Sequence, residues 1–172
     1  MVGRSFPLGA SLAAGGVNFA LFSRDASAVE LLLFDREDDA RPSRVVVIDP
    51  AENRTYHYWH GFVPGIAAGQ MYGFRVYGPA DPARGLRFDS SKILLDPYGR
   101  AVVVPKNYDR KAAGTEGDNT ETAMKSVVVD SDAYDWEGDR PLQRPSSRTV
   151  IYELHVRGFT AHPNSGVPER KR

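Results

Sequence analysis

Three ionisable residues stand at alternate positions near the end of the chain. Glu153, His155 and Arg157 fall within residues 149–160, which read as a β-strand. Alternate residues of a strand share one face, so these three would form a polar face. The opposite face would be apolar, from Tyr152, Leu154 and Val156. A carboxyl and an imidazole two positions apart could serve as an acid and a general base. The favoured alternative is that they line a barrel interior and help to order its site.

Aromatic residues are the second group with possible chemistry. Sugars stack their C–H faces on tryptophan or tyrosine rings, while their hydroxyls need polar partners nearby. Two predicted strands that follow one another carry Tyr56, Tyr58, Trp59, Tyr72 and Tyr77. Four of these are candidate substrate-binding residues, namely Tyr58, Trp59, Tyr72 and Tyr77. The favoured alternative is a core, or a seam with a barrel, made of Trp59, Phe62, Tyr72, Phe74 and Val76.

The sequence gives little support for a metal site or a cofactor site. His57 and His60 are three apart on a predicted strand, so they face opposite ways and make a poor metal pair. The acidic residues 37–39 lack the spacing of a calcium loop. The chain contains no cysteine, which excludes disulfides and thiolate metal sites. We therefore predict no metal site and no cofactor.

The amino-acid composition limits the kinds of partner that the chain is expected to bind. The 172 residues carry 22 Lys and Arg against 22 Asp and Glu, so no broad basic field predicts binding to nucleic acid or to a membrane. The first residues lack the apolar stretch of a signal peptide, and no apolar run reaches the ~18 residues of a membrane helix. A cytoplasmic location is the expectation.

Short apolar segments, each stopped by turn residues, predict an antiparallel β-sandwich with almost no helix. The longer predicted strands are 17–21, 29–34, 45–48, 56–63 and 71–77, and shorter runs follow at 93–95, 101–104 and 126–129. No window of eleven residues keeps a helical period free of Gly and Pro. Residues 106–125 and 130–148 are polar and resemble connectors.

A set of ordered motifs carries a family resemblance. These motifs are residues 7–10, 16–23, 28–35, 59–65, 69–79, 87–88, 92–98, 125–130, 135–141 and 150–156. Together they cover nearly the whole chain to Gly166. In this order they resemble the start of a bacterial glycogen debranching enzyme of the isoamylase type, in glycoside hydrolase family 13.

The resemblance implies a three-part organisation. Residues 1–100 are expected to be an immunoglobulin-like, all-β sandwich of the carbohydrate-binding-type module family 48. Residues 101–148 would be a bridging segment, and residues 149–172 the start of a truncated (β/α)8 barrel. After residues 167–169 the family pattern breaks at Arg170, Lys171 and Arg172. A shortened chain, a partial gene or a frameshift would each account for that break.

The resemblance also implies a reaction, hydrolysis of α-1,6 branch points in glycogen and limit dextrin. The family's Asp nucleophile, Glu acid/base and third Asp lie on barrel strands well beyond the first. None of those motifs is present, so no catalytic residue is assigned and the chain alone is expected to be inactive.

Two roles for the module remain open. In the first, it packs against the barrel and shapes the substrate cleft. In the second, it is an autonomous glycogen- or α-glucan-binding module. The second role would be marked by two exposed tryptophans with a neighbouring Lys or Asn on one sheet face, and the sequence offers no convincing counterpart.

Overall fold

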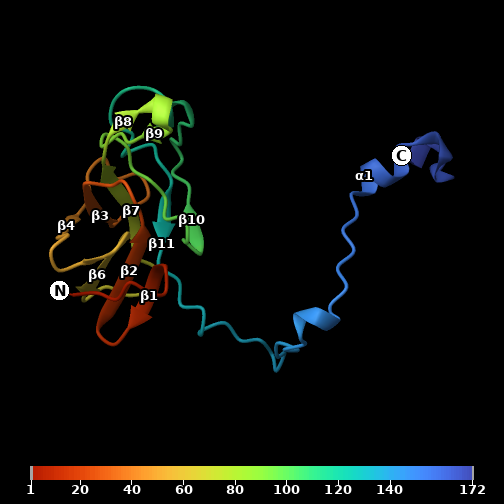
Figure 1. The fold of residues 1–172 in the computed structure, drawn as a ribbon, viewed down its shortest axis with the longest axis horizontal. Coiled ribbons are helices and arrows are strands. Elements are labelled where there is room, and N and C mark those ends of the chain that lie inside the picture. The colour runs from red at the N-terminus through yellow and green to blue at the C-terminus, as the bar shows by residue number, and fades with distance from the viewer. Residues whose placement is uncertain (1, 172) are drawn as a thin grey trace. The chain divides into compact units, whose positions relative to one another are not determined.

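Two antiparallel sheets form the body of the protein in a computed structural model that describes residues 2–171. The first sheet has the strand order β1 (Gly9–Ala13), β2 (Gly16–Phe22), β6 (Tyr58–Pro64) and β5 (Arg54–Thr55). The second has the order β10 (Ala101–Val103), β11 (Lys125–Val127), β7 (Met71–Tyr77), β3 (Ala28–Phe34) and β4 (Arg44–Ile48). Both are visible in Figure 1. The predicted all-β architecture is confirmed.

Alternation along the strands builds one core between the sheets. The first sheet contributes Val17, Phe19, Leu21, Trp59 and Val63. The second sheet contributes Val29, Leu31, Leu33, Tyr72, Phe74 and Val76. Within each strand these apolar positions are two or four residues apart, as a strand period of two requires.

The outer face of the second sheet is also covered. Leu32 and Phe34 point away from the main core and pack with Ile93 and Ala123. Leu94 forms a backbone bridge with Phe74 on β7, through two hydrogen bonds of 2.8 and 2.9 Å. Ile93 and Ala123 therefore form a second layer on this sheet.

Two buried lysines fix this layer in place. The ammonium of Lys92 donates to the backbone carbonyls of Ala112, Thr115 and Gly117. That of Lys125 donates to the carbonyls of Glu37, Thr120 and Ala123 at 2.7 to 3.2 Å. Burial lowers the pKa of Lys125, whose side chain is enclosed by these carbonyls. Each lysine ties together loops that lie far apart in sequence.

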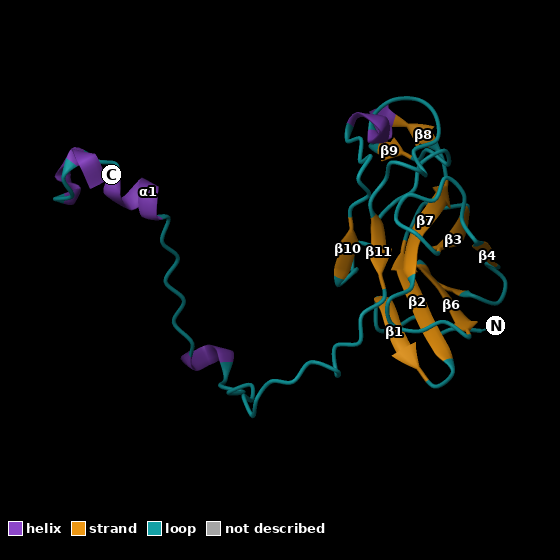
Figure 2. Cartoon of the chain, turned by 180° about the vertical axis from the view of Figure 1, so that it is seen from behind, coloured by secondary structure: helices purple, strands orange, loops and turns teal. Residues whose placement is uncertain are grey.

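The sandwich extends past residue 100, where the sequence analysis placed its end. Figure 2 shows β11 between β10 and β7, so both late strands belong to the second sheet. The small pair β8 (Ala80–Asp81) and β9 (Leu86–Arg87) flanks the 3-10 turn η1 (Pro82–Arg84), and η2 covers Lys111–Ala113. The first compact unit reaches Tyr134.

A second unit begins at Asp135. Its elements are η3 (Ser146–Arg148), α1 (Val156–Thr160), η4 (Pro163–Ser165) and η5 (Glu169–Lys171). Within residues 2–171, no helix is long and apolar enough to cross a membrane.

The strand expected over residues 149–160 is not formed. Residues 149–155 have no regular structure, and α1 starts at Val156 with His155 as its N-cap. A central barrel strand needs a neighbour on each edge, and the described part of this unit contains no other strand. Local hydrogen bonds then decide the conformation, and the Gly158 N–H donates to Nδ1 of His155 at 3.0 Å. The assignment to a barrel stays a prediction.

Candidate functional site

Two of the four aromatic residues proposed from sequence lie in the core. Trp59 and Tyr72 are both 0% exposed. Their polar atoms have internal partners, since Trp59 Nε1 donates to the Ser23 carbonyl at 3.0 Å and the Tyr72 hydroxyl donates to Asp96 Oδ2 at 2.8 Å. Neither ring has a free face for a sugar, so for this pair the structure agrees with the core alternative.

The other two residues lie on opposite outer faces of the sandwich. Tyr58 on β6 points outward from the first sheet, where it is paired with Phe22 on β2. Tyr77 on β7 points outward from the second sheet, and burial together with the neighbouring Glu30 carboxylate raises its pKa. The strands β6 and β7 are consecutive in sequence but belong to different sheets. The predicted four-residue platform is therefore not assembled.

A different aromatic group is brought together where the β5–β6 hairpin meets the end of β2. We call Phe22, Tyr56, His57 and Tyr58 the hairpin cluster. The Tyr56 and His57 ring centroids are 3.7 Å apart, and Phe22 makes edge contacts with His57 at 6.0 Å and with Tyr58 at 5.4 Å. Tyr56 is 78% exposed and Phe22 46%. Tyr56 and Tyr58 were noted in the sequence, but Phe22 joins them only through long-range strand pairing.

The hairpin beneath this cluster is held firmly. Arg54 donates from Nε to the Tyr56 carbonyl at 3.0 Å, and its guanidinium lies 4.7 Å from the centre of the Trp59 ring. The Ser23 N–H donates to the His57 carbonyl at 2.9 Å, which ties the hairpin to the chain after β2. These contacts fix the turn independently of any ligand.

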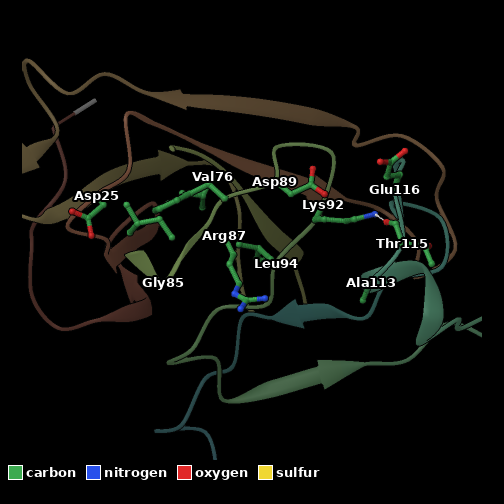
Figure 3. A pocket seen from close by; sticks show the side chains of 13 residues that line it. Asp25, Val76, Gly85, Arg87, Asp89, Lys92, Leu94, Ala113, Thr115 and Glu116 are labelled. Atoms are coloured by element: carbon green, nitrogen blue, oxygen red, sulfur yellow. Dashed lines mark hydrogen bonds between the residues drawn. The ribbon is translucent and has the colours of Figure 1, made fainter. Parts of the chain in front are cut away.

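A pocket of about 700 Å³ lies elsewhere on the first unit. Its apolar wall comes from Val76, Phe88 and Leu94, and its charged residues are Asp25, Arg87, Asp89, Lys92 and Glu116. Figure 3 shows Arg87 between Asp25 on one side and Glu116 on the other. Lys92 is committed to backbone carbonyls, whereas Arg87 makes no ion pair within residues 2–171. The pocket thus offers both apolar and hydrogen-bonding groups.

The residues proposed from the sequence for acid–base chemistry are not brought together into a site within residues 2–171. Glu153, His155 and Arg157 are exposed in the second unit. His155 and Arg157 belong to the cap and body of α1 instead of one strand face. No group of three or more His, Asp or Glu residues among residues 2–171 could hold a metal ion.

Comparison with known proteins decides the family. The model of carbohydrate-binding module 48, the isoamylase N-terminal domain, matches residues 7–99. The chain belongs to the carbohydrate-binding module 48 family. This module corresponds to the N-terminal domain of isoamylase-type enzymes, so the resemblance found in the sequence is confirmed.

Curated relatives of this chain carry the names glycogen debranching enzyme and isoamylase. It is 46% identical over 170 residues to the glycogen debranching enzyme of Serratia proteamaculans, covering 94% of this chain and 24% of that protein. It is 40% identical over 170 residues to chloroplastic isoamylase 1 of Oryza sativa subsp. japonica, covering 97% and 21%. This chain spans about a quarter of the length of the curated relatives that it matches.

A solved structure shares the fold. A pullulanase mutant from Paenibacillus barengoltzii, complexed with maltotriose, aligns with a TM-score of 0.54 and 25% identity. The alignment covers 94% of this chain and 21% of the pullulanase chain.

Proposed function

We propose that this chain is the N-terminal module of an isoamylase-type glycogen debranching enzyme, which packs against a catalytic barrel and shapes its substrate cleft. The observation that carries the proposal is the extent of the similarity. The module 48 match ends at residue 99, whereas 46% identity to the Serratia enzyme covers 94% of the chain. The similarity therefore includes the bridging segment and residues after it as well as the sandwich. A free-standing binding module has no need of them.

In this proposal the three regions have separate tasks. Residues 1–100 form most of the module, residues 101–148 complete its second sheet with β10 and β11 and bridge it to the enzyme, and residues 149–172 begin the barrel. Glu153, His155 and Arg157 would share a face when neighbouring strands pair with residues 149–160, and would line the barrel interior. The hydrolysis of α-1,6 bonds belongs to residues outside this chain, which contributes positioning of the α-glucan. We expect the enzyme to work in the cytoplasm, without nucleic acid or membrane partners.

A chimera tests this role directly. Residues 1–172 replace the matching part of the Serratia debranching enzyme, and release of reducing ends from limit dextrin is measured. We expect kcat/KM to stay within about tenfold of the parent enzyme. The same enzyme without its N-terminal part serves as the control, and it should lose most of its activity and thermal stability. A chimera no better than that control would refute the packing role.

The chain alone should release no reducing ends from glycogen, pullulan or limit dextrin. Activity above a buffer blank that disappears in Glu153→Gln would instead give Glu153 a catalytic role.

The second candidate function is autonomous α-glucan binding. The exposed hairpin cluster favours it, because its rings are not used by the core. Sedimentation of the chain with glycogen separates the two roles, since packing alone predicts that the chain stays in the supernatant.

A further inference from the structure

We infer that the hairpin cluster is a stacking site for the pyranose rings of an α-glucan, with Tyr56 as the principal contact. The choice of α-glucan rests on the proposed function. The site itself rests on the geometry of Phe22, Tyr56, His57 and Tyr58. It lies where β5 and β6 meet the end of β2 in the first sheet, and none of its four residues lines the pocket drawn in Figure 3.

The rings form a continuous apolar surface and are not single exposed residues. Tyr56 rests on His57, His57 meets Phe22, and Phe22 meets Tyr58. One face of Tyr56 is used by His57, while 78% of the residue remains exposed. An exposed apolar group of this kind is typical of a binding surface. The flat C–H face of a sugar matches an aromatic ring in size and polarity.

The backbone of Tyr56 holds this ring in an unfavourable conformation. Its φ of 58° lies in the left-handed region, where Asn, Asp and Gly are favoured and a bulky aromatic residue is unusual. Such strain persists only where surrounding contacts hold it, and it is concentrated at functional sites. Here Arg54 holds the Tyr56 carbonyl, and Ser23 holds that of His57. A ring fixed in advance loses little entropy when a ligand stacks on it.

Polar groups around the rings suit a hydroxyl-rich ligand. The hydroxyls of Tyr56 and Tyr58 make no hydrogen bond within residues 2–171, and Nδ1 of His57 is buried without a partner there. Arg24 pairs with Asp25 at 3.1 Å. Arg54 reaches this rim through its bond to the Arg24 carbonyl, and its guanidinium is held by backbone carbonyls. Hydroxyls beside the exposed ring suit the hydroxyl groups of a sugar.

The expected affinity is low for one chain and higher for a branched polymer. A surface of one or two stacking rings gives a Kd of about 1 mM for a linear maltooligosaccharide. Glycogen presents many chain ends, so it would retain the protein more strongly where several molecules bind one particle.

The test is an NMR titration of the 172-residue chain with maltoheptaose. Amide signals of Ser23 and of residues 54–58 should shift, and the fitted Kd should be about 1 mM. Tyr56→Asn removes the ring but suits the left-handed backbone, so the fold is kept, and its Kd should rise about tenfold. Tyr56→Phe keeps the ring and should bind within about twofold of the wild type.

A matched control uses Tyr98, which is also an exposed tyrosine but lies outside the cluster. Tyr98→Ala should bind like the wild type. Shifts that map to Arg87 and Glu116 instead of the hairpin would overturn the proposal, as would unchanged binding in Tyr56→Asn. Absence of any shift at saturating maltoheptaose would do the same. An active chimera together with failed titration would refute this site alone and leave the debranching role intact.

Discussion

At the residue scale, His60 shows how a polar side chain on an outer face becomes buried. It points away from the core on β6, yet it is only 4% exposed. Its Nε2 lies 3.0 Å from the Thr55 hydroxyl, and Nδ1 has no partner within the described chain. The segment before β1 runs close by, where the Gly3 N–H donates to Asn53 Oδ1 at 3.3 Å. Burial lowers the pKa of His60.

This lowered pKa predicts a pH-dependent stability. Below the ordinary value of 6.5 the unfolded chain binds a proton at His60, whereas the folded chain resists it. The free energy of unfolding should therefore fall as the pH drops from 6.5 through the folded-state pKa. His60→Gln should flatten this slope in urea titrations at several pH values. The exposed His162→Gln serves as the control, and an equal flattening there would contradict the assignment to His60.

At the element scale, the contact between β7 and the layer above it depends on a glycine, Gly73, which has no side chain to hold the layer away. A methyl group at Gly73 would lie 2.6 Å from Cγ2 of Ile93, inside van der Waals contact. Ile93 is buried and branched at Cβ, so it cannot move aside easily. Gly73 thus allows the second layer to lie directly on the sheet.

Gly73→Ala should lower the free energy of unfolding by about 1–3 kcal/mol, as overpacking does in closed cores. The matched control is Gly61→Ala, another strand glycine, where an added methyl meets nothing within 4 Å. That variant should change stability by less than about 1 kcal/mol. Urea denaturation of both proteins measures the difference, and equal midpoints would contradict the packing argument.

Element positions were largely predictable, whereas sheet membership was not. Alternation placed the strands at 17–21, 29–34, 45–48 and 71–77 within β2, β3, β4 and β7. The predicted strand 56–63 was wrong in its first two residues, because Tyr56 and His57 form the β5–β6 turn. Two-residue hairpin turns usually contain Asn-Gly or Asp-Gly, and this turn contains Tyr-His instead, so no local turn signal was present. The split of β6 and β7 between sheets depends on contacts remote in sequence, which no local pattern contains.

The candidate site was predictable only in part, because it too depends on contacts between residues far apart in sequence. Burial of Trp59 beside outward-pointing Tyr58 follows from a period of two and was foreseeable as the core alternative. The pairing of Phe22 with Tyr58 was not, because it joins strands separated by more than thirty residues.

At the whole-molecule scale, the first unit contains its own core and its own sheet contacts. Ending the chain after Tyr134 should therefore leave the thermal midpoint within about 4 °C of the full chain. Hydrogen exchange should show protection from Val17 to Val76 in both proteins and little from Val150 to Thr160 in the full chain. Strong protection of residues 150–159 in a monomer would contradict this independence.

A shorter chain ending at Met124 is the matched control. It removes β11 and the buried Lys125, and it should not fold cooperatively.

The position of β11 has a consequence for how the protein is made. It is the last strand in sequence, yet it lies inside the second sheet between β10 and β7. A ribosome delivers residues in order, so β10 has no neighbour to join until residue 127 has left the exit tunnel. Assembly of the module must wait for nearly its whole length, and a nascent chain exposes apolar strand faces to chaperones until then. Stalled nascent chains of increasing length should become protease-resistant abruptly once β11 has emerged, whereas a gradual rise would show that the sheet closes without it.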